Sequence, residues 1–285
     1  MFIFNIIIFT SLFSTLQLFW PENGFAWGPG IHAAVALHSL DNVRLMLPPI
    51  GKLILAFPRE YFYGCLAADF FIGKSWKKEA NHPHNWEGGF AFLKESSNDQ
   101  EKAFSYGFMA HLAADVIAHN FFIPSLLSVN PIRRGHLYWE IRADHWIGLS
   151  YLKMAREILK MDHQECDDLL KVISGNKKIN IKAKKQIFTQ SVKFSNYFSL
   201  THDFVFLGNS AGWKVINKYM KYMIDISCLT VNNFLMDPTS SPCLSYDPMG
   251  LKKIRLAKHK RLLNRPLLKS HLIGGFAIDK EFLDL

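Results

Sequence analysis

The chain has 285 residues, enough to bury one large hydrophobic core or two small ones. Hydrophobic residues make up 49% of it and charged residues 20%, which excludes a chain that is disordered throughout and fits an ordinary globular protein. The formal net charge of +9 favours anionic partners such as membrane surfaces or nucleic acid, but it selects neither of them and specifies no fold.

The N-terminal segment reads as a targeting sequence. Residues 1–20 carry no charged side chain and are rich in Phe, Ile and Leu. Gly24 and Ala26 then stand three and one positions before a cut, where a signal peptidase accepts small residues. We therefore expect residues 1–26 to be a signal peptide and the mature protein to be secreted or periplasmic. The alternative is an uncleaved transmembrane anchor, because the apolar segment can just span a bilayer and no Lys or Arg lies near its start.

Helical spacing of apolar residues dominates the rest of the chain. It predicts helices over 31–46, 101–120, 136–158, 164–174 and 209–235. We expect the first to stop at Pro48-Pro49 and the second to end before Pro124. Strand-like alternation is hard to find, and the region beyond 245 is a basic helical stretch. The prediction is a single all-α domain over 27–285 with about eight to ten helices.

The cysteines leave two interpretations open. They are widely spaced and form no C-x-x-C pair, which argues against a cysteine-ligated zinc site. In an oxidising compartment they would permit one or two disulfides, and four buried thiols are the alternative. The four residues are Cys65, Cys166, Cys228 and Cys243.

Histidines and carboxylates recur at the spacing of one helix face. His111, Asp115 and His119 lie four residues apart and fan across about 80° of a helix. His136 and Glu140 repeat this arrangement on the next predicted helix. Two helices that each present a histidine and a carboxylate inward can build a polynuclear metal site in a bundle core, where unpaired charge would be costly.

The alternative to a metal site is an ordinary surface hydrogen bond. A single His and Asp pair four residues apart is more often of that kind. Here Met109, Leu112 and Val116 make the flanks apolar, and Asp144 follows Glu140 by one further turn. Ligation by nitrogen and oxygen without cysteine favours zinc, and open coordination positions favour catalysis over a structural role.

Five short motifs occur in an order that resembles a known family. They are Trp27-Gly-Pro-Gly-Ile-His32, Gly64-Cys-Leu-Ala-Ala-Asp69, His84-Asn-Trp-Glu87, His111-Leu-Ala-Ala-Asp115 and His136-Leu-Tyr-Trp-Glu140. Together they resemble the zinc-dependent phospholipase C family of bacteria, whose fold and trinuclear zinc site are shared with the single-strand-specific P1-type nucleases. The motifs cover Trp27 to about Glu140, and the rest of the chain is similar by helical character only.

The resemblance implies a multi-helix bundle around three Zn²⁺ ions. In the family the mature chain begins with a tryptophan whose amine and carbonyl bind zinc, which supports cleavage after Ala26. Asp115 would bridge two ions, and Asp69 would be a ligand or the catalytic base that orients the attacking water. The implied ligands are Trp27, His32, Asp69, His84, His111, Asp115, His119, His136 and Glu140.

Two of these assignments stay open. His84 is preferred over His82 because it begins the motif of histidine, any residue, aromatic and acidic residue. The family's next histidine usually lies six residues after the bridging aspartate, whereas His119 lies four after Asp115. His145 is therefore held in reserve for His119.

The implied activity is that of a phospholipase C that cleaves the glycerol-side phosphodiester bond with a metal-activated water. A phospholipid or other phosphodiester is the expected substrate, the charge permits contact with a membrane surface, and nucleic acid is favoured less. Aromatic residues near Asp69, including Tyr61, Tyr63 and Phe70, would either wall a lipid-accepting cleft or belong to the core. The alternatives are a P1-like nuclease or nucleotidase and a non-catalytic, zinc-stabilised helical protein.

Overall fold

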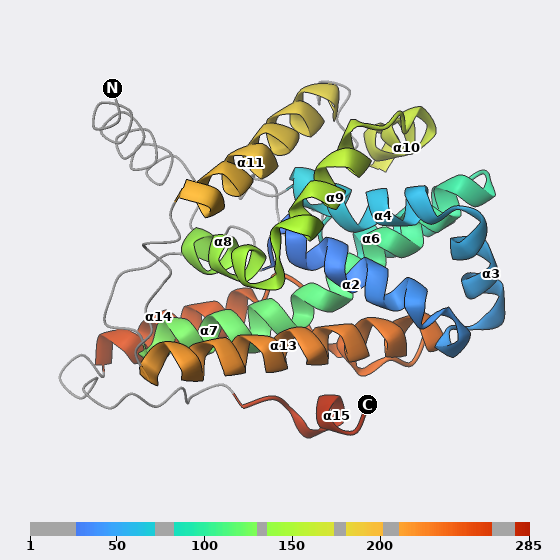
Figure 1. The fold of residues 1–285 in the computed structure, drawn as a ribbon. Coiled ribbons are helices and arrows are strands. Elements are labelled where there is room, and N and C mark those ends of the chain that lie inside the picture. The colour runs from blue at the N-terminus through green and yellow to red at the C-terminus, as the bar shows by residue number, and fades with distance from the viewer. Residues whose placement is uncertain (1–26, 72–82, 130–135, 174–180, 202–210, 264–276) are drawn as a thin grey trace, which may run out of the picture.

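The computed structural model describes residues 27–71, 83–129, 136–173, 181–201, 211–263 and 277–285. Within these ranges every regular element is a helix (Figure 1), so the predicted all-α fold is confirmed. Residues 1–26 and His82 lie outside the described residues, so the signal peptide and the single-domain boundary stay predictions.

The helices outnumber the eight to ten expected. They are α2 (Pro29–Asp41), η1 (Val43–Leu45), α3 (Pro48–Ala56), α4 (Pro58–Ala67), η2 (Ala68–Phe71), α5 (Trp86–Glu95), α6 (Asp99–Ile117), η4 (Ala118–Phe122), α7 (Ile123–Val129), α8 (His136–Ile147), α9 (Leu149–Lys160), α10 (Gln164–Ile173), α11 (Ile181–Thr201), α13 (Ala211–Met236), η5 (Pro242–Ser245), α14 (Leu251–Leu263) and α15 (Lys280–Leu283).

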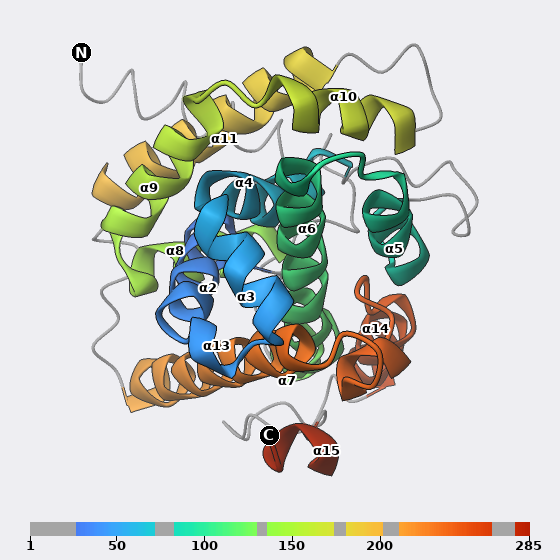
Figure 2. The same cartoon turned by 90° about the vertical axis from the view of Figure 1, so that its right-hand side faces the viewer.

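Helix α6 runs through the centre of the bundle with the other helices around it (Figure 2). Every residue from Gly107 to Phe122 is buried, including the polar side chains of His111, Asp115 and His119. The helical stretch Asp99–Leu127 is long and apolar enough to cross a membrane by length and composition, but its apolar window is completely buried inside the protein. It is the core helix on which the rest of the fold is built.

Helices α4 and α6 approach each other backbone to backbone. A Cβ atom on Gly64 would lie 2.0 Å from the carbonyl oxygen of Phe104, and one on Gly107 would lie 2.0 Å from that of Tyr61. Only glycine permits so close an approach. The contact brings the end of α4, and η2 directly after it, against the buried face of α6.

Proline positions differ from the sequence predictions in two places. The helix predicted over 31–46 ends at Asp41, before η1, so the expectation that it stops at Pro48-Pro49 was wrong. Pro48 instead begins α3, because a proline is well suited to the first turn, where its missing N–H is not needed. The prediction that the helix over 101–120 ends before Pro124 was wrong. That helix continues through the π-helical turn η4 into α7, and Pro124 lies in the first turn of α7, where a proline is tolerated.

The remaining predicted helices are largely confirmed. The predicted helices over 164–174 and 209–235 correspond to α10 and α13, and the basic stretch beyond 245 contains α14. The predicted helix over 136–158 is divided into α8 and α9 by Gly148, whose φ of 118° lies in the region that favours glycine. All four cysteines are buried and free, so the thiol alternative holds.

Candidate metal centre

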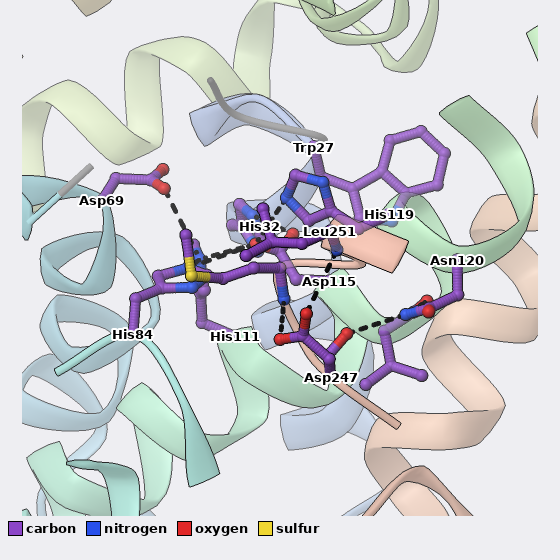
Figure 3. A network of polar contacts seen from close by, with 12 residues as sticks. Trp27, His32, Asp69, His84, His111, Asp115, His119, Asn120, Asp247 and Leu251 are labelled. Atoms are coloured by element: carbon purple, nitrogen blue, oxygen red, sulfur yellow. Dashed lines mark hydrogen bonds and ion pairs between the residues drawn. The ribbon is translucent and has the colours of Figure 1, made fainter. Parts of the chain in front are cut away.

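Asp115 on α6 lies at the centre of a buried group of histidines (Figure 3). Its Oδ2 atom lies 3.2 Å from Nε2 of His111 and 3.3 Å from Nε2 of His84. The same oxygen lies 3.6 Å from Nε2 of His119, whereas Oδ1 lies 3.4 Å from Nε2 of His32. The two carboxylate oxygens of Asp115 therefore face different histidines.

Separate parts of the chain supply these side chains. His111 and Asp115 come from successive turns of α6, and His119 follows on the π turn η4. His32 comes from α2, and His84 lies directly before α5. His119 lies four residues after Asp115 and so faces the same way, and the π turn on which it stands is of a kind frequent at functional sites.

A tight contact with the C-terminal part of the chain holds the π turn. The side-chain amide of Asn120 donates a hydrogen bond of 2.8 Å to the carbonyl oxygen of Asp247 (Figure 3). Gly250 has a φ of +56°, and a Cβ there would lie 2.3 Å from the carbonyl oxygen of His119. Residues more than a hundred positions away thus fix the backbone on which His119 stands.

The tautomer of His111 follows from its second nitrogen. Nδ1 lies 2.8 Å from the carbonyl oxygen of Cys65, and a carbonyl oxygen can only accept, so Nδ1 carries the proton and donates. Burial lowers the pKa of His111 and nearby His32 lowers it further, which keeps the ring neutral. Nε2 therefore presents a lone pair to the Asp115 carboxylate and to Nε2 of His84, which is 3.0 Å away.

Asp69 extends the group from η2. Its Oδ1 lies 3.5 Å from Nε2 of His111, and neither of its carboxylate oxygens makes a hydrogen bond. Burial raises the pKa of Asp69 well above its usual value, and the negative charges of Asp115 and Glu140 raise it further. Burial also acts to raise the pKa of Asp115, but the neighbouring histidines, His111 first, lower it well below its usual range.

Many buried polar atoms of this cluster lack a hydrogen bond. An unsatisfied buried donor or acceptor costs about 1–3 kcal/mol, so several of them in one place indicate a missing partner. Each is an oxygen or an imidazole nitrogen, the donor types that zinc takes in the absence of cysteine. The atoms include Nε2 of His32, both carboxylate oxygens of Asp69 and of Asp115, Nδ1 of His119 and Oε1 of Glu140.

The spacing of the cluster fits a zinc ion. A tetrahedral zinc with ligand bonds of about 2.0–2.1 Å sets its ligand atoms about 3.3–3.4 Å apart. The facing atoms of His84, His111 and Asp115 lie 3.0, 3.2 and 3.3 Å apart. Ligand atoms of His32, Asp69 and His111 form a second group, within 4.8 Å of one another.

A comparison with known families agrees with this donor set. The family model for zinc-dependent phospholipase C matches residues 31–189, which is more than half of the chain. The chain belongs to the zinc-dependent phospholipase C family. The matched span holds every predicted ligand from His32 to Glu140 and begins after Trp27. No curated protein and no solved structure was found to match the chain.

For three ligands predicted from the phospholipase C resemblance, the structure gives burial or backbone position rather than a distance to the histidines around Asp115. Glu140 on α8 is buried, and its pKa is raised by burial first and then by Asp144 and Asp115, so its carboxylate lies within the field of the cluster. The backbone of His136 begins α8, but its side chain lies outside the described residues. Trp27 is completely buried, and its indole stacks on Phe122 of the π turn with ring centroids 4.6 Å apart.

Asp144 is a buried residue of α8, as its spacing from His136 and Glu140 predicts. Its Oδ1 accepts a hydrogen bond of 2.9 Å from the backbone N–H of Ile31, at the start of α2. Burial raises the pKa of Asp144 to about 7, although its backbone hydrogen bonds act to lower it. The sequence signal for this contact is the pair of glycines, Gly28 and Gly30, that leave room for the carboxylate.

The aromatic residues near Asp69 belong to the core rather than to an open cleft. Tyr61 and Tyr63 are completely buried, and Phe70 is 4% exposed. Trp86 is half-buried, and its indole N–H donates a hydrogen bond of 2.9 Å to the carbonyl oxygen of Tyr246. The idea that these residues wall a lipid-accepting cleft is therefore wrong for Tyr61, Tyr63 and Phe70.

Proposed function

We propose that this protein is a phospholipase C that hydrolyses the glycerol-side phosphodiester bond of phospholipids, releasing diacylglycerol and a phosphorylated head group. One observation carries the proposal: the lone pair of His111 Nε2 faces a carboxylate oxygen of Asp115 at 3.2 Å and a second imidazole nitrogen at 3.0 Å. His111 Nε2 and Asp115 Oδ2 are both acceptors, and two acceptors that face each other in a buried site repel unless a cation lies between them. Membership of the zinc-dependent phospholipase C family supports a phospholipid as the substrate.

Three zinc ions are the proposed complement. Asp115, with its two oxygens facing different histidines, suits a bridging ligand. Bound zinc would lower the pKa of a water molecule towards neutrality and stabilise negative charge on the phosphate oxygens. The proposed sets are Asp69, His84 and His111 for the first ion, Trp27 and His32 for the second, and His119, His136 and Glu140 for the third.

Asp69 is the proposed base. Both of its oxygens lack a hydrogen bond and it lies at the edge of the cluster, next to His111, so it can accept a hydrogen bond from the attacking water. Its neighbours Asp115 and Glu140 make it a stronger base, because their negative charges favour its protonated form. Asp69 would thus orient the water and hold the proton that the water releases.

Export is part of the proposal. The amine of Trp27 is free to bind zinc only if the residues before it have been removed, because an amide nitrogen has no available lone pair. The buried position of Trp27 against the π turn that carries His119 is what such a ligand would require. We therefore propose that the mature, exported chain begins at Trp27.

Metal analysis together with a substrate panel tests this function. We expect the purified protein to contain zinc and to hydrolyse a chromogenic phosphocholine ester, and Asp69→Asn to abolish turnover. His38→Gln, an exposed position on the same helix as His32, is the matched control and should behave like the wild type. Cleavage of single-stranded DNA in preference to the ester would favour the nuclease alternative, and zinc binding without turnover of either would favour a non-catalytic role.

A further inference from the structure

The connection between α2 and α4 exposes several large apolar side chains. Leu45 is 55% exposed, Leu47 44% and Leu55 57%. The backbone N–H of Leu47 donates to the carbonyl oxygen of Leu235 at 3.0 Å, which places this connection beside Met236, itself 50% exposed. We refer to Leu45, Leu47, Leu55 and Met236 as the leucine face.

The leucine face is held in place by the core beneath it. Ile50 and Ile54 of α3 are buried, at 3% and 0% exposure. Gly51 lies so close to η1 that a Cβ there would be 3.1 Å from the carbonyl oxygen of Val43. α3 therefore lies across the front of the bundle (Figure 2), with its apolar outer residues fixed towards solvent. Single exposed apolar side chains are common on protein surfaces, whereas a group of them usually marks a site that binds a partner.

Cations outnumber acids around the leucine face, where Asp237 follows Met236 as an exposed acid. Arg44, Lys52 and Arg59 are exposed between the leucines and beside them. Asp41 is the one exposed acid over 41–59, all of which the structure describes. Exposed leucines interleaved with Lys and Arg are typical of segments that lie in the head-group region of a membrane, where the apolar side chains enter the acyl boundary and the cations meet phosphates.

A groove continues the apolar surface from α3 towards the end of α5 and the first turns of α6. It measures about 430 Å³ and is lined by Leu53 and Phe57 on one side and by Leu93 and Tyr106 on the other. Lys52 and Lys102 also line it together with Asp99, so the groove combines an apolar wall with two cations and one acid. Such a combination suits an amphiphilic partner more than a polar one.

We propose that the leucine face binds the surface of an anionic phospholipid bilayer and holds the protein on its substrate. The choice of a phospholipid partner rests on the proposed function. A second copy of this chain is the less suitable occupant, because a two-fold contact would bring Arg44, Lys52 and Arg59 close to the same cations of its partner. Phosphatidylserine head groups provide the opposite charge.

Vesicle binding without hydrolysis tests the surface separately from the catalytic reaction. Sucrose-loaded vesicles of equal parts phosphatidylcholine and phosphatidylserine, built from phosphonate analogues that cannot be cleaved at the glycerol-side ester, are sedimented with the full protein. We expect Leu45→Asn/Leu55→Asn to weaken binding about tenfold, since about half of each side chain would otherwise enter the lipid. Lys52→Glu should weaken it at least about fivefold and reduce its dependence on salt.

The control is a pair of comparably exposed leucines on other helices. Leu256 of α14 is 44% exposed and Leu283 of α15 52%, so Leu256→Asn/Leu283→Asn removes similar apolar surface away from the leucine face and should leave vesicle binding unchanged. Turnover of a water-soluble phosphocholine ester should be the same in all variants. Undiminished binding by the Leu45/Leu55 variant, or no vesicle binding by the wild type, would overturn the proposal. A loss of self-association in sedimentation velocity without a loss of vesicle binding would assign the face to a second copy instead. If no protein turns over the ester while only the Leu45/Leu55 and Lys52 variants lose vesicle binding, the proposed phospholipase activity is contradicted and the membrane-binding role of the leucine face is supported.

Discussion

Asp144 and Ile31 are joined by a buried hydrogen bond from the backbone N–H of Ile31 to Oδ1 of Asp144, 2.9 Å long. It connects α8 to the first turn of α2, one residue before His32. The carboxylate also meets the positive end of the α2 dipole. Because Gly28 and Gly30 both lie against this carboxylate, the N-terminal segment with its two predicted ligands is positioned by a residue that is not itself a predicted ligand.

A double-mutant cycle between Gly28 and Asp144 checks this arrangement. A Cβ on Gly28 would lie 2.3 Å from Oδ2 of Asp144, and the three nearest atoms all belong to that carboxylate. Gly28→Ala should therefore lower the free energy of unfolding by about 1–3 kcal/mol in the wild type. In the Asp144→Ala background the same change should lower the free energy of unfolding by at least about 1 kcal/mol less, because the obstructing carboxylate is gone. Urea unfolding of the four metal-free proteins measures the coupling, and strictly additive costs would contradict the contact.

The pKa of Asp144 predicts a pH dependence of the metal-free protein. Burial raises it from 3.8 to about 7, so the folded state keeps a proton that the unfolded state has already released between those values. The free energy of unfolding that this group contributes should fall as the pH rises from about 4 to about 7. Asp144→Asn keeps the acceptor oxygen and cannot titrate, so it should be less sensitive to pH than the wild type over this window. Equal slopes for the two proteins would show that Asp144 is ionised in the folded state throughout.

The bridging role of Asp115 predicts coupled losses. Asp115→Asn removes one of the two anionic oxygens that face the histidines, so at least one zinc should be lost per chain and turnover should fall at least about a hundredfold. Asp225→Asn, at an exposed carboxylate paired with Lys221, is the control and should change neither quantity. Zinc counting and ester turnover on the same preparation decide the matter. Full zinc content with normal turnover in the Asp115 variant would remove Asp115 from the site.

The close approach of α4 and α6 makes Gly107 sensitive. A Cβ there would lie 2.0 Å from a backbone oxygen of Tyr61, so Gly107→Ala must move the two helices apart. That movement should lengthen the hydrogen bond from His111 to the Cys65 carbonyl, lowering zinc affinity about tenfold or more together with stability. Gly89→Ala is the control, because the nearest atom to its Cβ is the flexible side chain of Met109 at 3.0 Å. Competition with a zinc chelator measures the affinity, and equal affinities for the two variants would contradict this account.

The proposed mature terminus predicts a loss of one metal when the chain is extended. One additional alanine before Trp27 should convert its amine to an amide and remove about one zinc per chain, while the helical content measured by circular dichroism stays the same. Intact mass of the exported protein shows whether cleavage follows Ala26. A native chain that begins at Met1, or an extended chain with unchanged zinc content, would favour the membrane anchor over the signal peptide.

Local spacing predicted the part of the site that lies on one helix. His111, Asp115 and His119 share a face because α6 and the π turn keep them at nearly helical spacing. Periodicity could not show that the helix continues past Pro124, because the π turn depends on packing against Asp247 and Gly250, far along the chain.

The partner of Asp144 could not be predicted for a similar reason. Its spacing from Glu140 gives the face of α8 on which it lies, but not what faces it across the bundle. That partner is the start of α2, more than a hundred residues earlier, and only tertiary packing determines it. The leucines of the leucine face likewise carry no periodic signal that separates them from core residues.

The cluster draws its ligands from the first half of the chain but its support from the second half. Ser227 accepts the indole N–H of Trp27 at 3.0 Å, and Asp247 and Gly250 hold the backbone around His119. During synthesis the histidines therefore leave the ribosome well before the segments that fix their positions. In the nascent chain the histidine side chains would not yet be held in position, so their affinity for zinc would be low. The high-affinity site would form only when translation is nearly finished. For the phospholipase C activity that we propose, this order delays activity until the polypeptide is almost complete.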